Sequence, residues 1–215
     1  MINSKNELIT GIIIAAGKSS RMGQFKPLMK YSGRTFIHHI ISKLDLICRQ
    51  IIIVTGFNSD RLKSEAVKNL KEYDQKSLLS KIRFVENMEY ESGMFTSLQR
   101  GLKEIADPDD FSPVKSWVVY HFVDQPGLPA DFYTGFIEQI DSSHNWIQPS
   151  YNKQNGHPVL LKNELFKRIL ETDKKASLRD VSKMSEVKKK IWECGYKNIL
   201  QDLDTPEDFH SNGGN

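Results

Sequence analysis

Residues 11–16 read Gly-Ile-Ile-Ile-Ala-Ala, and this stretch decides the fold because no polar side chain interrupts it. A strand with one face in water alternates polar and apolar residues, whereas a strand of a parallel sheet is covered on both faces and is apolar throughout. Later runs of similar character are found at residues 50–55, 82–85, 117–123 and 146–148. The sequence therefore predicts a mostly parallel sheet built from these buried strands.

The segments between these runs have apolar residues at helical spacing, at 35–46, 59–73, 94–106 and 130–140. Strands that alternate with helices form βαβ units, whose right-handed crossovers cover both faces of one sheet. We predict a doubly wound α/β fold in a single domain over residues 8–210, with flexible ends at 1–7 and 211–215. The less regular part predicts a short apolar run at 158–161, helices near 164–170 and 178–184, and a turn from 205.

The composition excludes several classes of protein. The chain has 215 residues, and its 39% hydrophobic content is enough for a buried core. The 30 basic and 27 acidic residues leave a net charge of +3, which gives no electrostatic reason to expect nucleic acid or an acidic membrane as a partner. No apolar run approaches the ~20 residues of a membrane helix. Residues 1–10 lack a basic-then-apolar leader, so we expect a cytoplasmic protein.

Cysteine and histidine give no sign of a metal centre. Cys48 and Cys194 form neither a disulfide framework nor a metal cluster, and the histidines lack the spacing of a zinc site. Residues 188–190 are three consecutive lysines, which we interpret as a solvated face, although a polyanionic ligand could use them. Met94, Phe95 and Leu98 are predicted to belong to the core.

The loop after the first strand is the candidate ligand site, because ligands of open α/β sheets bind beyond the carboxyl ends of the strands. Its small residues let a ligand approach backbone N–H groups that can hold phosphate oxygens; they are Ala15, Ala16, Gly17 and Ser19. Arg21 and Lys26 add cations that can spread over a triphosphate. The loop fits neither the P-loop nor the dinucleotide fingerprint. An ordinary glycine-containing surface loop remains the alternative.

Residues 15–28, with the pattern Ala-Ala-Gly-x-Ser-x-Arg-Met-Gly-x-x-Lys-x-Leu, resemble the signature of nucleotidyltransferases that attach a nucleoside monophosphate to a phosphorylated acceptor. Within that superfamily the chain is most similar to the molybdopterin cytidylyltransferase group. The later segments that carry this similarity are Asn87 with residues 93–98, then 124–126, 156–159, 178–180 and 202–208. The resemblance implies a nucleotide-binding part at about 8–125 and an acceptor-binding part at about 126–210.

Nucleotidyl transfer brings a phosphate nucleophile to a polyanionic triphosphate, so a divalent cation is expected, and Mg²⁺ prefers carboxylate, water and phosphate oxygens. Asp124 follows the run at 117–123 and would point into the cleft, although it could instead cap the next turn. Asp202 and Asp204 alternate along the chain, so only one of them can reach the metal. The resemblance selects Asp204, which could also cap a helix that begins at Pro206.

The resemblance further implies the roles of individual residues. Arg21, Lys26 and Asp124 would be catalytic, Ser97 would contact base or ribose, and His157 would orient the acceptor or shape its loop. Ser97 equally fits a helix that begins near residue 96.

The substrates implied are CTP rather than GTP, because the segment reads Ala-Ala-Gly, and molybdopterin or its molybdenum-loaded form, for delivery to a molybdenum hydroxylase. The alternatives are a relative acting on another phosphorylated metabolite and a non-catalytic carrier of the nucleotide-modified cofactor. A nicotinamide-dependent oxidoreductase would share the sheet but lacks its phosphate fingerprint here.

Overall fold

The protein, for which a computed structural model was obtained, is described over residues 8–105 and 116–203. Its central sheet has the order β10-β7-β9-β6-β1-β4-β5, with β8 paired to β7. The strands are β1 (Leu8–Ile14), β4 (Gln50–Thr55), β5 (Ile82–Glu86), β6 (Ser116–Phe122), β7 (Trp146–Tyr151), β8 (Gln154–Asn155), β9 (Val159–Lys162) and β10 (Lys189–Glu193). A small separate hairpin consists of β2 (Lys30–Tyr31) and β3 (Arg34–Thr35).

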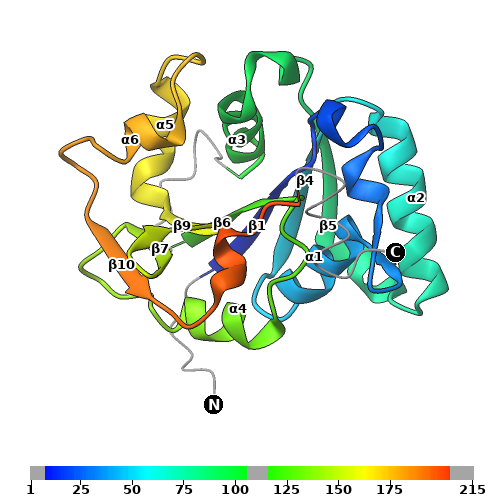
Figure 1. Ribbon diagram of the computed structural model, residues 1–215. Helices are drawn as coiled ribbons and strands as arrows, with labels where there is room; N and C mark the ends of the chain where they lie inside the picture. The colour runs from blue at the N-terminus through cyan, green and yellow to red at the C-terminus, as the bar shows by residue number, and fades with distance from the viewer. Residues whose placement is uncertain (1–7, 106–115, 204–215) are drawn as a thin grey trace.

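Helices cover both faces of the sheet, as Figure 1 shows, which confirms the predicted doubly wound fold. Each predicted helical segment contains a helix: α1 (Phe36–Leu44), α2 (Ser59–Glu72), α3 (Met94–Lys103), α4 (Ala130–Ile137), α5 (Phe166–Glu171) and α6 (Leu178–Val181). The pairs β1–β4, β1–β6, β4–β5 and β7–β10 are parallel. None of the helices in the described part of the chain is long and apolar enough to cross a membrane.

Two hydrophobic cores lie on opposite faces of the sheet. Along β1 the side chains alternate between them, with Ile13 in the core under α1, α2 and α4, and Ile12 and Ile14 in the core under α3, α5 and α6. This alternation is the period of two of an extended chain, and it explains why a strand covered on both sides has no polar position.

The sequence prediction did not specify two strands of the sheet. The apolar run at 158–161 forms β9, which is antiparallel to both β6 and β7. The predicted solvated face is confirmed, because Lys188 and Lys189 are exposed. Lys189 also begins the edge strand β10, which pairs with β7 and was not predicted. Its outer side chains stay in water, and charged residues on a sheet edge discourage pairing with another chain. The predicted turn from 205 and both predicted flexible ends lie outside the described residues.

The register of β1 and β6 positions the candidate site. Ile14 is paired with Phe122 at the carboxyl ends of the two strands, and the Val123 N–H donates to the Ile14 carbonyl at 3.2 Å. The loops that follow these strands therefore leave the sheet side by side.

Candidate active site

A cavity of about 190 Å³ opens at the carboxyl ends of β1 and β6. Its walls come from the loop after β1, the start of α3 and the end of β6: Ile14, Ala15, Gly17, Ser19, Ser20, Lys26, Pro27, Met94, Phe122, Val123 and Asp124. The sequence predicted a ligand site at this edge of the sheet, and the structure brings several of its candidate residues together there.

Lys26 is the buried cation of this cavity. The preceding loop turns back because Ser19 takes a left-handed conformation (φ 54°) and its Oγ accepts a hydrogen bond from the Lys26 backbone N–H at 3.1 Å. The Lys26 side chain is 9% exposed, and its Nζ lies 3.8 Å from Oδ2 of Asp124. Lysine is rarely so buried without an anionic partner. The ion pair therefore fixes a positive charge in the wall of the cavity.

Asp124 is held by contacts to the backbone on both sides of its loop. Its carbonyl accepts a hydrogen bond from the Leu203 N–H at 3.0 Å, and the Pro126 carbonyl accepts one from Lys43 Nζ at 2.6 Å. Burial lowers the pKa of Lys43 to about 8. The Asp124 side chain remains 24% exposed, so its carboxylate can meet a ligand in the cavity.

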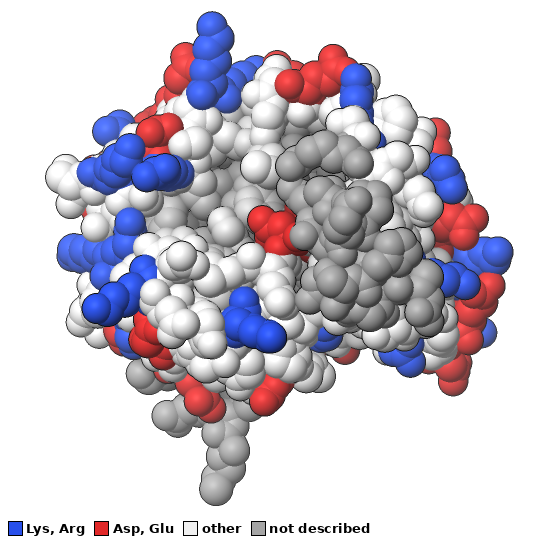
Figure 2. Space-filling view, in the orientation of Figure 1, with Lys and Arg blue, Asp and Glu red and all other residues white. Residues whose placement is uncertain are grey.

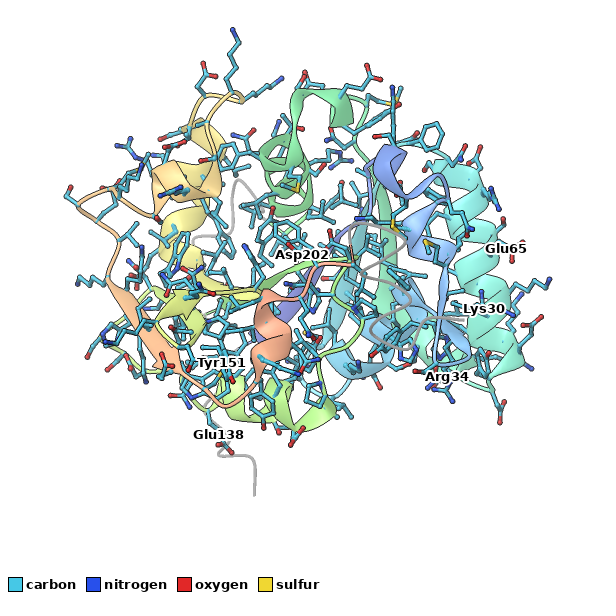
Figure 3. All side chains as sticks on the ribbon, viewed as in Figure 1. Lys30, Arg34, Glu65, Glu138, Tyr151 and Asp202 are labelled. Atoms are coloured by element: carbon cyan, nitrogen blue, oxygen red, sulfur yellow. The ribbon has the colours of Figure 1, made fainter. Side chains whose placement is uncertain are left out.

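Gln125 joins the same loop to the C-terminal part of the chain. Its Nε2 donates to the Ile199 carbonyl at 3.2 Å and to Oδ1 of Asp202 at 2.9 Å. Asp202 is exposed near the middle of the face shown in Figure 3. Neither Gln125 nor Lys43 was assigned a role from the sequence. The Asp-Gln-Pro segment was the available signal for Gln125, whereas nothing in the sequence points to Lys43.

The small residues of the loop differ in their surroundings. Ala15, Gly17 and Ser19 line the cavity, but Ala16 does not. Ala16 is 2% exposed, and its carbonyl accepts a hydrogen bond from the Phe57 N–H at 3.1 Å. Ala16 thus ties the loop to the segment after β4, and a contact from Ala16 to nucleotide stays a prediction.

Ser97 lies in a buried polar cluster beneath the start of α3. Asn87, which is 3% exposed, donates from Nδ2 to Thr96 Oγ1 and to Ser97 Oγ, each at 3.0 Å. Its Oδ1 accepts from the Glu89 N–H at 3.0 Å. Asn87 therefore has a structural role, because it joins the segment after β5 to the start of α3. Nucleotide binding by Ser97 stays a prediction.

Met94 corrects one prediction about the core. Phe95 and Leu98 are buried as expected, but Met94 is 61% exposed and lines the cavity. Met94 is the first residue of α3, and its side chain faces the cavity instead of the core. Gly93 precedes it with φ 114°, a conformation that favours glycine.

Two predicted site residues cannot be placed. The Arg21 side chain and the whole of Asp204 lie outside the described part of the chain. Within that part, no group of three or more His, Cys, Asp or Glu residues is gathered to hold a metal ion.

His157 lies between this cavity and a second, larger one. Its backbone N–H donates to the Ile199 carbonyl at 3.1 Å, and a Cβ at Gly156 would collide with Ile199, which explains the glycine. The imidazole lines the second cavity, of about 580 Å³, and its ring centroid lies 4.5 Å from that of Phe122. Burial lowers the pKa of His157 to about 4, so the ring is neutral at pH 7.

The lysine, the carboxylate and the glycine-containing loop lie at the carboxyl edge of a doubly wound sheet, which is where α/β proteins of this class bind their ligands. Residues 11–190 match the family model described as MobA-like NTP transferase domain. The chain therefore belongs to the MobA-like family of nucleotidyltransferases, which confirms the family resemblance of residues 15–28.

Curated relatives agree with this assignment. The chain is 27% identical over 200 residues to the molybdenum cofactor cytidylyltransferase of Escherichia coli strain K12, covering 92% of each protein. It is 21% identical to a probable molybdenum cofactor guanylyltransferase of Bacillus cereus strain G9842, covering 66% of this chain and 62% of that protein.

The fold has close structural neighbours. A Mycobacterium sp. strain JC1 homolog of a Mycobacterium tuberculosis protein superimposes with a TM-score of 0.71 at 20% identity, covering 94% of this chain and 93% of the other. The M. tuberculosis H37Rv protein in complex with manganese gives a TM-score of 0.66 at 17% identity, covering 96% of this chain and 98% of the other.

Proposed function

We propose that the protein transfers CMP from CTP to the terminal phosphate of molybdopterin, or of its molybdenum-loaded form, and releases pyrophosphate. The observation that carries this proposal is the Lys26–Asp124 pair in the wall of the cavity beside the loop after β1. The match to the E. coli molybdenum cofactor cytidylyltransferase covers 92% of both proteins. The Ala15-Ala16-Gly17 segment supports cytidine over guanosine through the family resemblance.

The chemistry is an in-line displacement at phosphorus. An oxygen of the acceptor phosphate forms a bond to the α-phosphorus of CTP, and the bond from that phosphorus to the bridging oxygen breaks, so pyrophosphate leaves with the electron pair. Negative charge grows on the α-phosphate and on the leaving group. Lys26 stabilises that charge from a buried position, where water screens it little, and Arg21 is proposed to add a second cation. Positioning and charge stabilisation suffice without a protein nucleophile.

Asp124 and Asp204 are proposed to hold Mg²⁺. The described residues fit this ion, because Asp124 offers a partly exposed carboxylate in the cavity wall, and Mg²⁺ takes one or two carboxylates together with water and phosphate oxygens. When bound, the ion would reduce the repulsion between the acceptor phosphate and the triphosphate. The manganese complex of the structural neighbour supports a divalent metal site.

The proposal divides the domain by function. Residues 8–125 bind the nucleotide, with the small residues of the loop and Ser97 in contact with phosphates, ribose or base. Residues 126–210 bind the acceptor, with His157 beside it. The product would pass to a molybdenum hydroxylase in the cytoplasm.

Guanosine is the second candidate base, because relatives that match 66% of this chain are probable guanylyltransferases. A non-catalytic carrier would need no metal carboxylate, so the placement of Asp124 beside Lys26 favours the enzyme. Another phosphorylated acceptor would use the same catalytic residues.

The experiment is to supply each of the four ribonucleoside triphosphates with Mg²⁺ and molybdopterin and to measure pyrophosphate. We expect the fastest release with CTP, and none from the Asp124→Asn variant, whose circular dichroism should match the wild type. Asp74→Asn is the matched control, because Asp74 is exposed on the turn after α2 and has a positive φ that Asn tolerates. Full activity of Asp124→Asn would refute the proposed role, and CTP binding without turnover on any acceptor would favour the carrier.

A further inference from the structure

The second cavity has the dimensions of a small-molecule site. Its volume of about 580 Å³ exceeds that of the first cavity, and pockets for small organic ligands typically span about 300–1,000 Å³. It lies among β7, β8, β9, α6 and β10, and its described lining contains no carboxylate: Trp146, Gln148, Asn155, His157, Val159, Leu178, Arg179, Ser182, Lys183 and Lys189.

The charge of this lining is positive and largely uncompensated. Arg179 and Lys189 form no ion pair with any other described residue, and Lys183 pairs only with the carboxylate of Asp180, at 3.7 Å. That pair is solvent-exposed and therefore weak. Figure 2 shows Lys and Arg side chains gathered along the left side of the hollow in the viewed face. The missing counter-charge points to an anionic ligand.

Lys189 lies beside a rigid wall of the cavity. Its Nζ is 5.4 Å from the centre of the Trp146 ring, and its pKa is lowered because the side chain is partly buried. The Trp146 ring is fixed in turn, since Nε1 donates to Gln148 Oε1 at 3.3 Å, while Gln148 Nε2 donates to the Gly156 carbonyl at 3.1 Å. An ammonium held over a fixed ring is a preorganised binding group.

The walls of the two cavities are in contact through a pair of rings. Phe122 lines the first cavity and His157 lines the second, and their ring centroids are 4.5 Å apart. A molecule in the second cavity therefore lies next to the wall that carries Asp124. Nδ1 of His157 is buried, so Nε2 is the ring nitrogen that can contact such a molecule.

We propose that the second cavity holds the body of the acceptor, and that Arg179 and Lys189 bind an anionic group of the acceptor other than the phosphate that is nucleotidylated. The inference rests on the proposed function, because that function places the reacting phosphate at Asp124. The acceptor class is then an organic phosphate with a second negative charge at a distance from its phosphate. Lys183 adds to the positive potential at the rim.

The kinetic test compares the wild type with an Arg179→Gln/Lys189→Gln double variant. We expect the KM for molybdopterin to rise about 10- to 100-fold, since two charge-assisted contacts are lost, while kcat and the KM for CTP stay within a factor of about two. Lys63→Gln/Lys167→Gln is the matched control, because it removes two exposed charges from α2 and α5 outside the cavity lining. An unchanged KM for molybdopterin in the cavity variant would overturn the proposal.

A binding test separates this inference from the proposed function. ¹⁵N-labelled protein is titrated with inorganic phosphate while the indole N–H resonance of Trp146 is followed. We expect a saturable shift in the wild type and in the control variant, and none in the cavity variant. If the wild type releases no pyrophosphate with molybdopterin, the proposed function fails, and a variant-sensitive phosphate shift still supports the anion site. Absence of the shift in the wild type overturns the anion site whatever the activity.

Discussion

Nζ of Lys26 lies 3.8 Å from Oδ2 of Asp124, although the two residues belong to distant parts of the sequence. The pair forms because β1 and β6 are adjacent parallel strands with Ile14 opposite Phe122, so the chain leaves both strands at the same edge. The position of the positive charge in the cavity thus depends on strand register and on the turn closed by Ser19, rather than on a freely mobile lysine.

The first prediction concerns Lys26→Met. Removal of a preorganised charge that stabilises a transition state should reduce kcat/KM by about 10²- to 10³-fold. Pyrophosphate release measures this loss, and Lys30→Met provides the control because Lys30 is an exposed lysine on β2. A variant within threefold of the wild-type rate would show that Lys26 only compensates the charge of Asp124.

The second prediction concerns the acid sensitivity caused by His38. This side chain is 1% exposed, and neither of its ring nitrogens has a hydrogen-bond partner among the described residues. Burial, with Arg34 nearby, lowers the pKa of His38 to about 4 from 6.5. The unfolded chain therefore binds the additional proton between pH 6.5 and pH 4, so this contribution to stability is complete above pH 6.5 and is lost as the pH falls.

We expect His38→Phe to raise the free energy of unfolding at pH 7 by about 1 kcal/mol, because it removes buried polar atoms without partners. It should also reduce the loss of stability between pH 6.5 and pH 4. Urea unfolding at a series of pH values measures both effects. His39→Phe should instead destabilise the protein, because His39 Nε2 is hydrogen-bonded to the Tyr31 carbonyl at 2.6 Å. Equal acid sensitivity of the His38→Phe variant and the wild type would contradict the assignment.

The third prediction concerns the buried amide of Asn87. Asn87→Ala leaves the hydroxyls of Thr96 and Ser97 and the Glu89 N–H without this partner, so we expect a loss of about 1–3 kcal/mol in unfolding free energy. Denaturant titration measures the loss. Ser97→Ala should be milder because it removes one contact of three. A fall in CTP affinity for Ser97→Ala, with little change in stability, would reveal direct nucleotide contact.

The fold was predictable from the sequence because its central strands are apolar on both faces, as residues 11–16 illustrate. The direction of β9 was not, since a four-residue apolar run carries no information on its partner. β10 could not be recognised as a strand from the sequence. Many side chains of an edge strand are exposed to solvent, and the β10 sequence Lys-Lys-Ile-Trp-Glu resembles a polar loop.

The candidate site was predictable where a residue follows a strand directly. Asp124 lies just after β6, at the edge where parallel strands end, and the family resemblance supported it. Lys43 was not predictable, because its partner is the carbonyl oxygen of Pro126, and backbone atoms leave no signal in the sequence. The cationic cavity was also missed, because Arg179 and Lys189 come from separate elements that only the folded sheet brings together.

The last prediction distinguishes the two candidate second metal ligands. The Leu203 N–H is hydrogen-bonded to the Asp124 carbonyl at 3.0 Å, so the residue that precedes Asp204 is tied to the backbone of Asp124. Asp202 already accepts a hydrogen bond from Gln125 Nε2 at 2.9 Å, which gives its carboxylate a structural role. We therefore expect Asp204→Asn to raise the Mg²⁺ concentration needed for half-maximal pyrophosphate release at least about tenfold, since removal of one carboxylate weakens a site that holds few protein ligands.

Asp202→Asn is the matched comparison, with the same chemical change two residues away, and it should shift the Mg²⁺ requirement less than about threefold, because an Asn carbonyl can still accept the Gln125 hydrogen bond. Titration of Mg²⁺ at saturating CTP gives both values. The opposite order, a large shift for Asp202→Asn and a small one for Asp204→Asn, would make Asp202 the second ligand.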